Sequence, residues 1–305
     1  MARIAAVVVA LAFAGMLATC VTASAHAPGA ATALAPPPGL ASGPPGMTPP
    51  ITPPEANTPD GNAPDDLEAA RSRTKSKSET KKAKPKSVAH RDPHLSSPSD
   101  AESTPAFHYA QLSQADCEAE LGARHIDFIR ETAAPVLAPV RLTGPLRGVV
   151  FRSDANEKAR ATSPYEIVDC RLVLALDDFA QILARHDIVE VRHYSMYRPP
   201  KPALDGEIGK RHSGALAIDA GRFYDRWGGE LDVNRDFHGA IGDKTCGDDA
   251  APHPATDAAL QLRAILCEAV DARLFNVVLT PNYNRPHKNH FHLEITAGVS
   301  WFLVH

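Results

Sequence analysis

Apolar residues recur every three or four positions in two long segments of the chain, and this spacing predicts amphipathic helices. The first segment is 172–186, and the second, which has the clearer stripe, is 257–273. A shorter helix is predicted over 113–122, because Ser113 and Asp116 have the spacing of an N-terminal capping box. The apolar positions of the two long segments are Leu172, Leu176, Phe179, Ile182, Leu183, Leu262, Ile265, Leu266, Ala269 and Val270.

Shorter runs of branched and aromatic residues lie between these segments and predict β-strands. Together, the helices and strands predict one α+β domain over 108–305, with an antiparallel or mixed sheet and flanking helices. The strand-like runs are 147–152, 188–197, 215–223, 275–280 and 290–295.

The chain before residue 108 lacks this periodicity. Residues 1–27 are typical of a secretory signal peptide, with a basic start, an apolar run and small residues at the cleavage site. The residues around Cys20 also loosely resemble a lipoprotein signal, so membrane attachment is expected only if Cys20 carries a lipid. The export signal places the domain in the periplasm or cell envelope.

Residues 28–107 are predicted to be a disordered linker. Proline-rich sequence up to residue 64 has few large apolar groups to bury and favours extended polyproline conformation. A basic run follows over 71–86, with eight Lys or Arg residues against one acid. Two interpretations of this run remain: a solvated spacer, or a contact with anionic wall polymer or lipid.

Composition adds two constraints. The formal net charge of −4 is too small to predict a nucleic-acid partner. Once the signal is removed, four cysteines remain, and an even number in an exported protein predicts two disulfides rather than free buried thiols. Of the three pairings, Cys117–Cys170 and Cys246–Cys267 are favoured because they join sequence neighbours and close modest loops.

Histidines in the segment 287–294 have the pattern of a metal site on a strand. Alternation places His290 and His292 on one face, with Phe291 packed behind them on the other. Neutral imidazole is a good zinc ligand near neutral pH. Glu294 projects from the histidine face, where it either orients a ligand or forms a plain salt bridge.

The segment 212–219 supplies the other candidate ligands. Asp219 lies on a predicted strand, and a bend at Gly214 is expected to bring His212 back over the same site. Two histidines and one aspartate leave one tetrahedral position open, which is typical of catalytic zinc sites. Zinc lowers the pKa of water at that position to roughly 7.

Arg198 ends a strand-like run ahead of His212. Its guanidinium is suited to stabilise charge that develops on a peptide carbonyl, although a surface salt bridge explains it equally well. The histidines at 238, 253 and 287 have no motif partner and are interpreted as ordinary surface residues.

These motifs resemble the LAS-type metallopeptidases, a group that includes lysostaphin-like enzymes, D-Ala-D-Ala metallopeptidases and the hedgehog domain. More narrowly, the region from about Cys117 to Leu293 is similar to the bacterial extensin-like C-terminal domain family. The similarity rests on Cys117, the Cys170-Arg171 pair, the Tyr197-Arg198 strand end, and the segments 212–219 and 289–293.

The resemblance implies a LAS- or hedgehog-like fold and a role for each residue. His212, Asp219 and His292 would bind zinc, His290 would act as general base or transition-state stabiliser, and Arg198 would bind the substrate carbonyl. The motif departs from the related pattern in one respect that bears on the loop. The related enzymes place glycine three residues after the first histidine, where this chain has Ala215.

The implied function is that of a zinc-dependent peptidase or amidase acting on peptidoglycan or its stem peptides. One alternative is a non-catalytic wall-binding or signalling module that retains the zinc-site fold. Another is a purely structural zinc site whose fourth ligand is His287 or Glu294.

Overall fold

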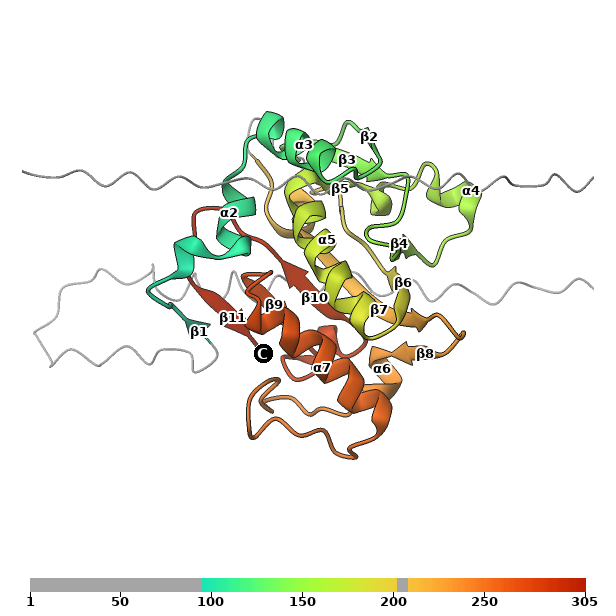
Figure 1. Cartoon of the computed structure of the whole chain (residues 1–305), viewed down its shortest axis with the longest axis vertical. Coiled ribbons are helices and arrows are strands. Elements are labelled where there is room, and N and C mark those ends of the chain that lie inside the picture. The colour runs from blue at the N-terminus through green and yellow to red at the C-terminus, as the bar shows by residue number, and fades with distance from the viewer. Residues whose placement is uncertain (1–94, 202–207) are drawn as a thin grey trace, which may run out of the picture. The chain divides into compact units, whose positions relative to one another are not determined.

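The computed structural model describes residues 95–201 and 208–305 of the 305-residue chain (Figure 1). The predicted signal peptide, Cys20 and the linker up to residue 94 lie outside the described residues. Within the described residues, no helix is both long enough and apolar enough to span a bilayer.

The described fold begins ahead of residue 108, inside the segment predicted to be linker. β1 (Leu95–Ser96), η1 (Ala101–Ser103) and the start of α2 (Pro105–Gln111) precede that position. Thr104 caps α2 by accepting a hydrogen bond from the amide of Phe107, and Ala106 is fully buried. The apolar contacts here come from alanines, which give little periodic signal.

An eight-stranded mixed sheet forms the centre of the described chain. Its strand order is β1–β11–β9–β10–β7–β6–β4, and β8 pairs with β7. The β4–β6 and β11–β9 pairs are parallel and the other pairs are antiparallel, so the predicted mixed sheet and α+β class are confirmed. The strands are β4 (Val150–Ser153), β6 (Ile188–His193), β7 (Ala217–Asp225), β8 (Glu230–Asp232), β9 (Val277–Leu279), β10 (Phe291–Glu294) and β11 (Phe302–Val304).

The two long predicted helices are present and pack on one face of this sheet (Figure 1). They are α5 (Cys170–Arg185) and α7 (Asp257–Asp271). Phe179 of α5 meets Phe275 edge to face, with ring centroids 5.8 Å apart. Each fully buried Leu or Phe side chain in this layer stabilises the fold by roughly 1.5–3 kcal/mol, so the apolar stripes are what fix the two helices on the sheet.

Shorter elements surround this layer. The predicted capped helix is α3 (Gln114–Ala123), where the Ser113 hydroxyl accepts a hydrogen bond from the Asp116 amide. A small antiparallel sheet that the pattern did not predict consists of β2 (Phe128–Arg130), β3 (Pro139–Leu142) and β5 (Val168–Asp169). The remaining helices are α4 (Glu157–Arg160), η2 (Pro164–Glu166), η3 (Arg211–Gly214), α6 (Val233–Asp236) and η4 (Arg285–His287).

Both favoured disulfides are present. Cys117–Cys170 joins α3 to the first residue of α5, and Cys246–Cys267 joins the loop after α6 to α7. The second bond therefore holds a long irregular segment against the helical layer.

One irregularity in β7 decides which side chains lie opposite the helices. Along β6, His193 pairs with Ala220 and Arg192 pairs with Arg222, so Gly221 is an extra residue in the ladder. Such a β-bulge interrupts the strict alternation of side chains along a strand.

The bulge gives the sheet a polar face on the side away from α5 and α7. Before it, Asp219 projects from that side; after it, Phe223 is buried in the helix-facing core, while Arg222 and Tyr224 are only partly buried. A Cβ at Gly221 would lie 3.0 Å from the ring of Tyr194, so a glycine allows this close approach. The polar face thus begins at Asp219 and continues along β7.

Candidate metal centre

The candidate ligands Asp219 and His292 are directly paired across β7 and β10. Because paired residues of antiparallel strands project from the same face, the two side chains meet, and His292 Nδ1 lies 3.1 Å from Asp219 Oδ1. Their neighbours Ile218 and Leu293, also paired, are buried on the opposite face beneath the helices. The apolar core therefore fixes the positions of the two ligands.

His212 reaches the same point from η3, just ahead of β7. Its Nε2 atom lies 3.0 Å from Asp219 Oδ1 and 3.3 Å from His292 Nδ1. The sequence predicts the bend at Gly214, but the residue with a left-handed backbone is Ala215, with φ 53°. It is Ala215 that ends η3 and directs the chain into β7.

The three atoms have the separations expected of ligands on one metal ion. Tetrahedral zinc ligands at about 2.0–2.1 Å from the ion are about 3.3 Å from one another. The observed distances are 3.0, 3.1 and 3.3 Å, and all three residues are buried: His212 is 9% exposed, His292 6% and Asp219 1%. Two imidazole nitrogens and one carboxylate oxygen therefore fit a metal such as zinc.

The outer nitrogen of each histidine is held by an acceptor. His212 Nδ1 lies 3.1 Å from the carbonyl oxygen of Met196, and His292 Nε2 lies 3.3 Å from Glu294 Oε2. Glu294 is itself held by the Thr296 hydroxyl, which donates to Oε1 at 2.6 Å. These partners accept the proton of the outer nitrogen of each imidazole, so His212 Nε2 and, once it has lost its own proton, His292 Nδ1 face Asp219 as ligand atoms.

Residues 115–302 match the family model described as Extensin-like protein C-terminus. The chain belongs to this extensin-like family. No curated protein and no solved structure matches the chain. The matched region begins in α3 and ends in β11, and it contains both disulfides and every candidate site residue named above.

The charge state of this extensin-like site suits metal binding. Burial opposes ionisation of Asp219, but the surrounding imidazoles hold its pKa well below the usual range. Burial lowers the pKa of His212. Burial also acts against protonation of His292, but hydrogen bonds with Asp219 and Glu294 outweigh it and raise the His292 pKa to about 9. The metal-free site therefore holds an ionised carboxylate, a neutral His212 and a proton on His292.

His290 lies beside these residues in the extensin-like domain, as the alternation predicts. Its Nε2 atom is 3.4 Å from Asp219 Oδ1, and its Nδ1 atom is 2.9 Å from Asn289 Oδ1. The ring packs edge to face against Tyr194, with centroids 5.8 Å apart. Burial lowers the His290 pKa to about 4, so its imidazole is neutral and can accept a proton at neutral pH.

Arg198 also reaches the site, but through a contact that the sequence pattern did not predict. Its guanidinium forms an ion pair with Asp219 Oδ2, and its Nε donates to the Ser195 hydroxyl at 2.9 Å. Ser195 in turn donates to Asp219 Oδ2 at 3.2 Å. Asp219 Oδ1 thus faces the two histidine ligands, and Asp219 Oδ2 is held by Arg198 and Ser195. The Arg198 side chain remains 53% exposed.

His287 was interpreted as a surface histidine, and the structure corrects this. Its ring centroid lies 5.2 Å from that of His290 and 5.7 Å from that of His292. Asn284 fixes it, with Oδ1 2.6 Å from His287 Nδ1, and burial lowers its pKa to about 3. The available sequence signal was Asn284 three residues ahead, the N-cap of η4.

Proposed function

We propose that this extensin-like domain is a zinc-dependent peptidase or amidase that acts on peptidoglycan peptides outside the cytoplasm. The observation that carries the proposal is the spacing of three buried ligand atoms on His212, Asp219 and His292, with both histidines oriented from behind. The motif resemblance to LAS-type metallopeptidases supports the reaction class by analogy. The two disulfides support an oxidising compartment.

Zinc bound here would supply a Lewis acid and a water of lowered pKa. The chain's own residues then have distinct roles. His290, neutral and oriented by Asn289, accepts the proton of the attacking water at Nε2. Arg198 neutralises Asp219 Oδ2, and its exposed N–H groups can donate to the substrate carbonyl oxygen as negative charge develops there.

The test combines metal analysis with turnover. The full chain is purified without added metal, its zinc content is measured, and muropeptides are incubated with the zinc-loaded protein. We expect about one zinc per chain and released peptide products, both lost in His292→Ala. His108→Ala, at an exposed position on α2, is the matched control. A wild-type protein without zinc, or turnover unaffected by His292→Ala, contradicts the proposal.

One observation favours a second candidate function, a wall-binding module with a closed metal site. His290 Nε2 is close enough to the ligand cluster to serve as a fourth ligand, which would leave no open position. His290→Ala separates the two functions. In a catalytic site, this variant keeps its zinc and loses turnover. In a closed structural site, it loses the zinc itself. A wall-binding module would also bind intact sacculi without releasing products.

A further inference from the structure

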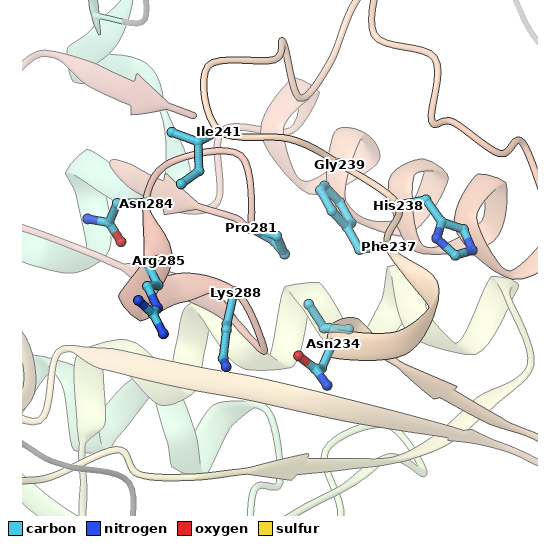
Figure 2. Close-up of a pocket in the computed structure, with 10 residues that line it drawn as sticks. Asn234, Phe237, His238, Gly239, Ile241, Pro281, Asn284, Arg285 and Lys288 are labelled. Carbon is cyan, nitrogen blue, oxygen red and sulfur yellow. The ribbon is translucent and has the colours of Figure 1, made fainter.

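A pocket of about 430 Å³ lies next to the candidate metal centre, between α6 and η4 (Figure 2). Phe237, Ile241 and Pro281 supply its apolar lining. Arg285 and Lys288 lie on the η4 side of the hollow (Figure 2). We call this the cationic pocket. None of these residues belongs to the predicted ligand set.

The cationic pocket and the metal centre share a wall. Asn284 lines the pocket, and its Oδ1 atom is 2.6 Å from Nδ1 of His287. The His287 ring in turn packs against those of His290 and His292. Asn284 and His287 therefore separate the pocket from the candidate ligands.

The far wall of the cationic pocket is fixed in place. Phe237 packs under the guanidinium of Arg263, whose central carbon is 4.4 Å from the ring centroid. Arg263 is buried on α7 and donates to the Thr245 carbonyl at 3.2 Å. The next residue, Cys246, is bonded to Cys267 of α7. The helical layer and a disulfide thus hold the loop that carries the apolar lining, so the pocket is formed before a ligand arrives.

The charge of the pocket selects its ligand. In residues 95–201 and 208–305, neither Arg285 nor Lys288 forms an ion pair with an acidic side chain, and both are exposed. Two unpaired cations beside a small apolar lining complement a carboxylate carried by a short chain with small side chains.

We propose that the cationic pocket binds a free carboxylate of the peptide substrate and so places the adjacent part of that peptide at the metal centre. The inference rests on the proposed function for its substrate class. It adds that the substrate is an anionic peptide, with small apolar side chains against Phe237 and Pro281.

The test measures binding separately from turnover. The full chain, with metal removed by a chelator, is titrated in a calorimeter with a stem tetrapeptide that has free carboxylates. The same peptide with amidated carboxylates is the second probe. The variant is Arg285→Glu/Lys288→Glu, compared with Lys158→Glu, which changes an exposed lysine on α4. Denaturant unfolding of each variant is measured in parallel to check the fold.

We expect the double variant to raise the Kd of the free-carboxylate peptide by roughly ten-fold or more, because two attractive charges become repulsive. Amidation should weaken binding to the wild type by a similar factor, and Lys158→Glu should change nothing. Equal Kd values for the two peptides, an unchanged Kd in the double variant, or no binding by the wild type would overturn the inference.

Failure of the proposed function has a different signature. The protein could lack zinc or turnover and still bind the free-carboxylate peptide through Arg285 and Lys288. That result would support the cationic pocket and contradict the proposed catalytic function. Conversely, zinc-dependent turnover with an unchanged KM in the double variant would support the catalytic function and contradict the role of the cationic pocket.

Discussion

Gly214 passes so close to Gly209 that a Cβ at position 214 would lie 2.1 Å from the Gly209 carbonyl oxygen. The Gly214 amide also donates to the Lys210 carbonyl at 3.0 Å. This contact closes η3 on itself and holds His212 over Asp219. A glycine is therefore needed here for space, while the left-handed turn is made by the next residue, Ala215.

Gly214→Ala should displace η3, because the clash is with rigid backbone. We expect a loss of stability of about 1–3 kcal/mol and weaker zinc binding, measured by denaturant unfolding and by chelator competition.

Ala215→Gly is the matched control. It relieves about 1–2 kcal/mol of left-handed strain and loses about 0.8 kcal/mol of methyl burial, so stability should change by less than about 1 kcal/mol and zinc binding should persist. Equal zinc binding by the two variants would contradict the proposed role of Gly214.

Glu294→Gln should reduce zinc affinity by about 10- to 100-fold, although Glu294 does not belong to the ligand set. The carboxylate accepts the outer proton of His292 and strengthens that imidazole as a donor. Thr296→Val, which removes only the hydroxyl that holds Glu294, should have a smaller effect. Affinity is measured against a zinc chelator. A larger loss in Thr296→Val than in Glu294→Gln would indicate a folding defect instead.

Zinc binding at pH 7 should release close to one proton. In the metal-free protein the His292 pKa is raised from 6.5 to about 9, so its proton stabilises the fold below pH 6.5 and that stabilisation is lost as the pH rises through 9. Zinc must displace this proton, so its affinity should rise roughly ten-fold per pH unit between pH 7 and 8.

Calorimetry in two buffers of different ionisation enthalpy counts the protons released. A pH-independent affinity would show that His292 is already neutral in the metal-free protein.

The two disulfides should differ in their contribution to stability. They close loops with sequence separations of 53 and 21 residues. Chain entropy predicts a loss of about 4 kcal/mol for Cys117→Ser/Cys170→Ser and about 3 kcal/mol for Cys246→Ser/Cys267→Ser. Because the ligands lie on η3, β7 and β10, which neither disulfide joins, either variant that remains folded should still bind zinc. Loss of zinc by a folded Cys246→Ser/Cys267→Ser protein would contradict this.

The sequence predicted the elements whose periodicity is strong. The long stripes of α5 and α7 and the alternation around His292 come from apolar residues that must pack on one face, so both position and orientation could be inferred. The small sheet was missed because β5 has only two residues and β3 begins with Pro139, neither of which gives a periodic signal.

The site was partly predictable for the same reason. Asp219 and His292 follow from strand alternation, but the route of His212 depends on the conformation of Ala215, which the residue type does not favour. His287 lies in a single 3₁₀ turn, where no repeat indicates a direction. The contact of Arg198 with Asp219 depends on the approach of separate chain segments, which local patterns do not encode.

The extra residue at Gly221 decides which face of the sheet each later residue of β7 occupies. Numbering by twos from Asp219 fails beyond it, so an alignment or a designed graft that treats β7 as a regular strand assigns Arg222 and Phe223 to the wrong faces. Deleting Gly221 would leave a regular ladder in which Arg222 and Phe223 keep their present faces, because the residue removed is the one without a partner on β6. In sequence comparisons within the family, a one-residue gap at this position therefore indicates loss of the bulge, with the polar and apolar faces of β7 preserved.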